Sequence, residues 1–167
     1  MSHAYQQKST SNDKLYEIDP NNFFLARSNS YKLPAEIIRD NALASSGLLV
    51  KKVGGPSVKP YQPDGLWLEK NSFSADLYNY KKNSGDSLYR RGMYTFIKRT
   101  SPPPSMIALD GTSREVCTVR REKTNTPLQA LVLMNDPQFF EASRILAERI
   151  QKEGGENYLD QIKYGFR

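Results

Sequence analysis

The sequence contains a single cysteine, Cys117, and a single histidine, His3. One cysteine cannot form a disulfide within the chain, and one residue of each kind cannot build a Cys/His zinc site or a CxxCH haem attachment. Cysteine–histidine catalysis is not expected either, because His3 lies in a terminal segment that should fray. We therefore expect Cys117 to be a small buried thiol, and we expect no metal and no cofactor in this chain.

Several other signals are missing. No run of about 18 apolar residues is present, so no membrane-spanning helix is expected. Residues 1–20 lack the apolar core of a signal peptide. The Gly54-Gly55 pair matches neither G-x-G-x-x-G nor a Walker motif, so a phosphate-binding loop is not supported. Apolar residues still make up 38% of the 167 residues, which is enough for one core with polar tails.

What is present predicts a mainly α fold, a loop-rich helical domain with long Pro/Gly-rich connections. Residues 1–32 form a polar arm, expected to be extended and to dock through Phe23 and Phe24, and residues 33–167 form the helical domain. Proline start signals, glycine end signals and apolar spacing predict helices at 35–48, from 86 or 87 to about 99, at 127–134, from 137 to about 153 and from 156 onward. Residues 101–105, which contain three consecutive prolines, are expected to be extended.

Positive charge is concentrated between Leu88 and Thr124. Eight of the lysines and arginines lie there against only three acids, which accounts for nearly all of the net charge of +6. The first interpretation is a buried network in which Arg114, Arg120 and Arg121 pair with Asp110, Glu115 and Glu122. Charge reversal at Arg120 or Arg121 should then unfold the domain.

Two other interpretations of this run stay open. The three arginines could form an exposed site for carboxylate, sulfate or phosphate, since a guanidinium binds these anions through two parallel hydrogen bonds. Nucleic-acid binding through residues 88–124 is a further alternative, although no known nucleic-acid motif accompanies the basic residues. The neighbouring Asn125 and Thr126 are expected to cap the helix that begins at Pro127.

The loop from Gly54 to Trp67 also has two interpretations. Its glycines and prolines exclude a regular element. Tyr61 and Trp67 could form a platform that stacks on a sugar or a peptide. Alternatively, the loop is a rigid connector whose Trp67 fills the core.

Four long segments carry a family resemblance: PAEIIRDNALASSGLL, GGPSVKPYQPDGLW, DSLYRRGMYTFIKRTSPPPSM and REVCTVRREKTNTPLQALVLMNDPQFFEASRILAERI. In this order they resemble the planctomycete cytochrome-associated PSD domain, a family of unknown function, and the likeness runs from about Tyr5 to Arg167. The resemblance implies the C-terminal module of a long exported or periplasmic bacterial protein. It also implies that this chain is truncated at both ends and that the haem lies in a separate domain.

Together these features predict a structural or ligand-binding module whose partners are other domains of the same polypeptide. We do not expect the chain by itself to be an enzyme. The alternative is an enzyme or enzyme subunit acting on polysaccharide, with the acids near Arg114 contributing. Acidic polysaccharide is a possible partner in the ligand-binding interpretation as well, whereas nucleic acid is not expected.

Overall fold

The structure is a computed structural model in which residues 3, 6–10, 12–68 and 78–166 are described. The chain divides into two compact units, Met1–Leu33 and Pro34–Arg167. The predicted mainly helical, loop-rich fold is confirmed. Over the described ranges, strand pairing is limited to isolated bridges such as those joining Val50 to Arg90 and Val58 to Thr95.

In the part of the first unit that the structure describes, residues 13–18 form a short helix, α1 (Asp13–Ile18), so the prediction of an extended arm is wrong for this segment. After the helix, the Asp19 carboxylate accepts hydrogen bonds from the backbone amides of Phe23 and Phe24, at 2.9 and 2.8 Å. The Arg27 guanidinium donates to the Asp19 carbonyl at 2.8 Å. These local bonds satisfy backbone groups that an extended arm would leave to water. The expected docking of the two phenylalanines stays a prediction.

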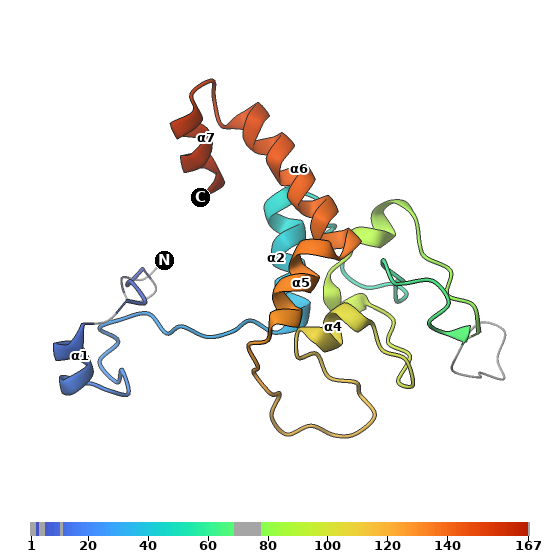
Figure 1. Cartoon of the computed structure of the whole chain (residues 1–167), viewed down its shortest axis with the longest axis horizontal. Helices are drawn as coiled ribbons and strands as arrows, with labels where there is room; N and C mark the ends of the chain where they lie inside the picture. The colour runs from blue at the N-terminus through green and yellow to red at the C-terminus, as the bar shows by residue number, and fades with distance from the viewer. Residues whose placement is uncertain (1–2, 4–5, 11, 69–77, 167) are drawn as a thin grey trace. The chain divides into compact units, whose positions relative to one another are not determined.

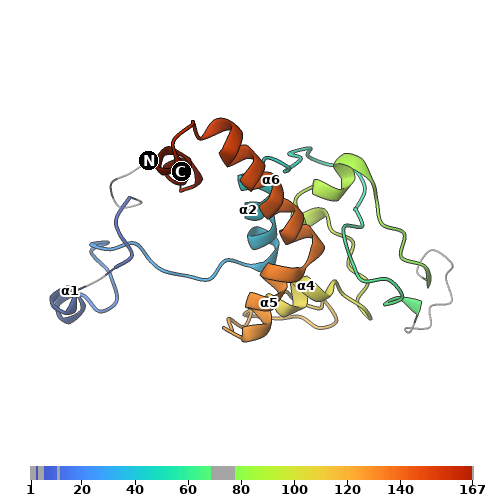
Figure 2. The ribbon, with the colours of Figure 1, turned by 45° about the horizontal axis from the view of Figure 1, so that its top comes forward.

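The second unit is built on two helices that lie side by side, α2 (Ala35–Ser46) and α6 (Pro137–Glu153) (Figures 1 and 2). The shorter α4 (Pro104–Ala108) and α5 (Pro127–Asn135) pack near the N-terminal end of α6, and α7 (Tyr158–Gly165) contacts α6. The core where these helices meet contains Ala35, Met106, Leu109 and Phe139.

Local sequence signals set the ends of the main helices as predicted. Gly47 follows α2 with a φ of 82°, a left-handed conformation that suits glycine at a helix C-terminus. The Asp136 carboxylate accepts a hydrogen bond from the Gln138 amide at 2.9 Å, and Pro137 occupies the first turn of α6. These positions confirm the helices expected from 35, from 127 and from 137.

The helix expected from 86 or 87 to about 99 is wrong. The segment forms two 3₁₀ turns, η2 (Gly85–Tyr89) and η3 (Gly92–Tyr94), and then runs extended. Its backbone pairs instead with the 50–58 segment: the Val58 amide donates to the Tyr94 carbonyl and the Phe96 amide donates to the Val58 carbonyl, both at 2.8 Å. The helical spacing of the apolar residues was therefore overridden by tertiary hydrogen bonding.

The proline run also differs from its prediction. Pro103 is extended, with φ −57° and ψ 122°, but Pro104 already begins α4. A proline is favoured in the first turn of a helix because its missing N–H has no partner there in any case. Only the first part of the 101–105 segment is therefore extended.

Candidate functional site

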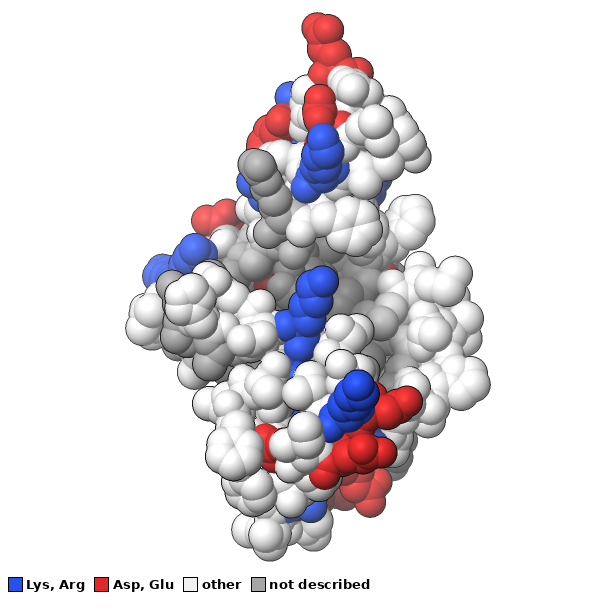
Figure 3. All heavy atoms as spheres, turned by 90° about the vertical axis from the view of Figure 1, so that its left-hand side faces the viewer, with Lys and Arg blue, Asp and Glu red and all other residues white. Residues whose placement is uncertain are grey.

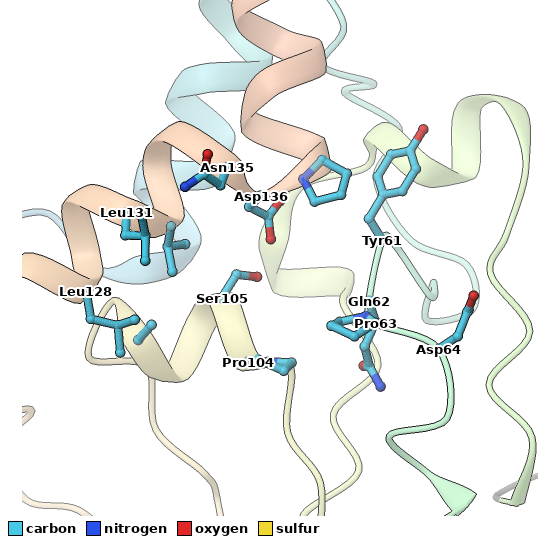
Figure 4. A pocket seen from close by; sticks show the side chains of 13 residues that line it. Tyr61, Gln62, Pro63, Asp64, Pro104, Ser105, Leu128, Leu131, Asn135 and Asp136 are labelled. Carbon is cyan, nitrogen blue, oxygen red and sulfur yellow. The ribbon is translucent and has the colours of Figure 1, made fainter.

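A cavity of about 520 Å³ lies between three segments that are far apart in the sequence. It is lined by residues 61–64 of the Gly/Pro-rich loop, by one face of α4, and by α5 with the start of α6 (Figure 4). The volume falls within the range of small-molecule sites, roughly 300–1,000 Å³. This cavity is the candidate site.

One wall of the cavity is apolar. Leu128, Leu131 and Val132 come from α5, and Ala108 comes from α4. Leu128 and Leu131 are each 55% exposed, so this wall is open to solvent. Exposed leucines on neighbouring turns of a helix are costly in water, and covering them with a ligand would recover that cost.

Polar groups lie between this wall and the 61–64 loop (Figure 4). In Figure 4 the Ser105 hydroxyl and the Asp136 carboxylate both point toward the middle of the cavity, whereas the Asp64 carboxylate lies at its far edge and points away. Asp136 is oriented by the hydrogen bond from the Gln138 amide, because it is also the N-cap of α6. The arrangement can therefore hold an apolar body on one side and a hydrogen-bond donor on the other.

The loop that forms the third wall is positioned by side chains from later segments. The Tyr80 hydroxyl donates to the Pro60 carbonyl at 2.5 Å, and the Arg90 guanidinium donates to the Pro56 carbonyl at 2.8 Å. The Arg90 guanidinium also stacks on the Tyr94 ring, 3.8 Å from its centroid. These contacts fix the loop backbone immediately before Tyr61.

The Tyr61 hydroxyl points away from the cavity, toward a small polar cluster behind it (Figure 4). There the Tyr89 hydroxyl donates to the Glu141 carboxylate at 3.0 Å. Partial burial, followed by the nearby carboxylate, raises the pKa of Tyr61, and the same causes raise the pKa of Tyr89 to about 12. Both phenols are therefore neutral at physiological pH, and Tyr61 presents its ring rather than a charge to the cavity.

A buried arginine joins α6, which begins at the site, to two other segments of the domain. Arg39 of α2 donates to the Gln138 side chain and to the Arg90 carbonyl, both at 2.6 Å, and to the Leu88 carbonyl at 2.8 Å. Burial lowers the pKa of Arg39 to about 10, and the Asp40 and Asp136 carboxylates act in the opposite direction. Arg39 therefore stays charged at neutral pH while it joins α2, α6 and the 88–90 segment.

A family model described as PSD1, protein of unknown function (DUF1553), matches residues 1–167. The chain belongs to the PSD1 family. No curated protein and no solved structure matches it. Membership assigns no activity, so the function of this PSD1 chain has to be argued from its geometry.

The three arginines of the basic run that were expected to form a buried network are not buried in this PSD1 chain. Arg114 and Arg120 are exposed, and Arg121 is 38% exposed. Arg121 pairs with Glu36 of α2 through two hydrogen bonds of 2.6 and 3.0 Å, and not with an acid of its own segment. The expected buried network is therefore wrong, because the 111–126 segment forms a surface loop and its charged side chains reach water. Their expected role in anion binding stays a prediction.

The acids expected to neutralise those arginines have other places. Glu115 and Glu122 are exposed. Asp110 accepts hydrogen bonds from the Thr124 amide and hydroxyl, at 2.9 and 2.6 Å, and from the Gln129 side chain at 3.2 Å. Asp110 therefore closes the base of the 111–126 loop against the first turn of α5.

The remaining predicted positions can be placed as well. Thr126 occupies the N-cap position of α5 but its side chain accepts no cap hydrogen bond there, and Asn125 is exposed. Cys117 is exposed, so the expected buried thiol is wrong, for the same reason as the arginines of this loop.

Trp67 fills the core and does not form part of an open platform. Its side chain is 1% exposed and packs edge-on against Tyr80, with ring centroids 4.9 Å apart. Of the two interpretations of the loop, the stacking platform is therefore wrong for Trp67, which fills the core as the connector interpretation has it. Tyr61 does reach the cavity, but the sequence reasoning missed Ser105, Leu128, Leu131 and Asp136. The signal that could have found them is the pair of Thr-Pro and Asp-Pro helix starts, which bracket one apolar helix.

Two classes of site find no support in the described part of the chain. No three His, Cys, Asp or Glu side chains come together there in a way that could hold a metal ion. None of the helices in that part is both long and apolar enough to cross a bilayer.

The pair between Glu36 and Arg121 predicts a pH dependence of stability. The hydrogen bonds from Arg121 are the main cause of a lowered Glu36 pKa, and partial burial opposes them. A lowered folded-state pKa contributes stability that is present above the unfolded value of 4.5 and is lost as the pH falls through the folded value. We expect the wild type to lose about 0.5–1 kcal/mol more unfolding free energy than Glu36→Gln between about pH 6 and pH 3.

Urea unfolding at a series of pH values measures this difference. Glu148→Gln is the matched control, because Glu148 pairs with Arg144 on the exposed face of α6 and should show a smaller effect. Parallel pH profiles for the wild type and Glu36→Gln would contradict the assignment.

Proposed function

We propose that this chain is a ligand-binding module and that the cavity between residues 61–64, α4 and the α5–α6 junction is its binding site. The observation that carries the proposal is the cavity itself, which combines an open apolar wall with a hydroxyl and a carboxylate aimed at its centre. Concave, largely apolar sites with a few converging polar groups are the usual form of small-molecule sites.

The rigidity of the surroundings supports the same proposal. Two of the walls are helices, and the third is a loop held by Tyr80 and Arg90. A site that is already formed loses little conformational entropy when a ligand binds. The cavity therefore does not depend on a rearrangement of the fold.

We further propose that the module belongs to a larger exported, cytochrome c-linked bacterial protein in which the haem lies in a separate domain. The resemblance of the four long segments supports this setting. The complete reading frame tests this setting. A reading frame that encodes neither an export signal nor a CxxCH module upstream of this domain would contradict it.

The two other functions considered find less support. A catalytic pair of acids should face each other across the substrate, but in Figure 4 Asp64 points away from the side of the cavity that Asp136 faces. For nucleic acid, Arg90 and Lys98 of the basic run are buried and cannot contact phosphates. Acidic as well as basic side chains are present on the face drawn in Figure 3.

Filling the cavity tests the proposal. Ala108→Phe places a ring in the cavity from α4, and we expect it to weaken binding of the neutral fluorescent probe N-phenyl-1-naphthylamine at least about tenfold. Ile107→Phe is the control, because Ile107 immediately precedes Ala108 in the same helix, is 40% exposed and does not line the cavity.

The readout is probe fluorescence titrated against each variant, with circular dichroism confirming that both are folded. Equal binding by the wild type and Ala108→Phe, or equal loss in both variants, would place the probe elsewhere and contradict the proposed site.

A further inference from the structure

We propose that the cavity selects organic cations, meaning an apolar body that carries an ammonium group, over neutral or anionic molecules of the same shape. This inference rests on the proposed ligand-binding function and names the chemical class of its ligand. Asp136, Ser105 and the apolar wall of α5 are the groups that would make the distinction.

The first argument is the charge of the lining. The described residues that line the cavity include two carboxylates, Asp64 and Asp136, but neither a lysine nor an arginine. The whole chain carries a net charge of +6. The cavity is therefore a local negative site on a positive protein, and it disfavours a bound carboxylate or phosphate by direct repulsion.

The buried guanidinium of Arg39 makes its hydrogen bonds to groups other than Asp136. Arg39 lies close enough to Asp136 for that carboxylate to raise its pKa. Arg39 is, however, also 3.6 Å from the Asp40 carboxylate, and its guanidinium donates to two backbone carbonyls and one side-chain amide. Asp40 is shared with Arg91, whose guanidinium also lies 3.6 Å from it, so Asp40 neutralises Arg39 only in part. The hydrogen bonds of Arg39 go to Gln138, Arg90 and Leu88 and not to Asp136, which leaves the Asp136 oxygens able to accept from a ligand in the cavity.

The second argument is geometric. One oxygen of Asp136 accepts the hydrogen bond from the Gln138 amide at 2.9 Å. An ionised carboxylate has about four acceptor positions, so Asp136 can still accept from a ligand. The Ser105 hydroxyl points toward the same space and adds a second acceptor (Figure 4). An ammonium group supplies three donors and no acceptor, which matches these two oxygens.

The apolar wall supplies the rest of the specificity. Leu128 and Leu131 lie to one side of Asp136 and Ser105, with the 61–64 loop on the other side, and each is 55% exposed (Figure 4). A ligand whose ammonium group meets Asp136 would lay its hydrocarbon part on these leucines. A small inorganic cation would leave the leucines uncovered and would gain nothing from them.

Three probes of equal length separate charge from shape: hexylammonium, 1-hexanol and hexanoate. Their dissociation constants would be measured by chemical-shift titration of the ¹⁵N-labelled chain, with shifts expected at the backbone amides around Ser105 and Leu131. We expect hexylammonium to bind about tenfold more tightly than 1-hexanol, because hydrogen bonds to charged groups are the stronger ones, and we expect hexanoate to bind most weakly. The net positive charge of the chain attracts hexanoate at long range. Tighter binding of hexylammonium than of hexanoate would therefore have to come from groups in the cavity.

Asp136→Asn identifies the residue responsible. Asparagine is as good an N-cap as aspartate, so α6 should keep its start. We expect Asp136→Asn to bind hexylammonium about tenfold more weakly than the wild type does, and we expect its affinity for 1-hexanol to change by no more than about twofold. Asp160→Asn is the control, since it removes the same charge from an exposed position on α7. If Asp136→Asn does not fold, Ser105→Ala is the second variant, with a loss confined to hexylammonium.

The outcomes separate this inference from the proposed function. Equal affinities for the three probes, or tightest binding of hexanoate, would overturn the selection of cations and leave a ligand site in place. Shifts away from the cavity for every probe, together with no effect of Ala108→Phe, would overturn both.

Discussion

Replacing Arg39 by methionine is expected to lower the free energy of unfolding by about 3–5 kcal/mol. The side chain is buried and forms three hydrogen bonds of 2.6–2.8 Å, to Gln138 and to the carbonyls of Leu88 and Arg90. Methionine fills a similar volume but donates nothing, so two backbone carbonyls lose a partner and the Asp40 carboxylate loses one of the two guanidinium groups that lie 3.6 Å from it.

Urea unfolding of the wild type and Arg39→Met measures this effect. Arg144→Met is the matched control, because Arg144 is 57% exposed and its pair with Glu148 spans one turn of α6. We expect Arg144→Met to lower the free energy of unfolding by no more than about 0.5 kcal/mol. Equal stabilities for the two variants would show that Arg39 does not join the helices as the structure indicates. Arg39→Lys should recover little, because one ammonium group cannot reproduce the planar fork of the guanidinium.

Replacing Trp67 by alanine is expected to lower the free energy of unfolding by about 3–5 kcal/mol, the usual range for truncation of a large buried aromatic side chain. The indole is 1% exposed and packs against Tyr80 and Phe96, with ring centroids 4.9 and 5.7 Å away. The ammonium groups of Lys59 and Lys98 lie 5.1 and 5.0 Å from the ring and add cation–π attraction. Alanine would remove all of these contacts and leave a cavity.

Chemical denaturation followed by circular dichroism measures the loss without relying on the indole. Phe140→Ala is the control, because Phe140 is 64% exposed and should cost well under about 1 kcal/mol. Trp67 is also the only tryptophan, so blue-shifted emission that acrylamide quenches poorly should accompany the folded state. If Trp67→Ala were as stable as the wild type but bound ligand more weakly, the core role of Trp67 would be contradicted and the interpretation of Trp67 as a ligand-stacking residue would be supported.

The helices with strong local signals could be predicted from the sequence. Pro127 and Pro137 start α5 and α6, and Gly47 ends α2, because these residues restrict or permit particular backbone angles wherever they occur. The segment around η2 and η3 could not be predicted in this way. Its apolar spacing is helical, but backbone pairing with residues 50–58 and the Arg39 hydrogen bonds decide its conformation.

The candidate site shows the same division. The sequence pointed to Tyr61 and to the Asp136–Pro137 helix start, but it gave no reason to bring either of them to Ser105 or Leu131. It also pointed to the wrong arginines. Arg114 and Arg120 stand in a dense basic run yet are exposed, whereas Arg39 stands in an ordinary amphipathic helix yet is buried.

The sequence by itself determined the mainly helical class, the starts and ends of the principal helices, and the inability of a chain with one cysteine to form an internal disulfide. These properties depend on the residues themselves or on neighbours within one helical turn. Only the tertiary structure decided which charges are buried and which side chains line the cavity. Those outcomes depend on contacts between segments up to about a hundred residues apart, as between Arg39 and Gln138, and no local pattern encodes them.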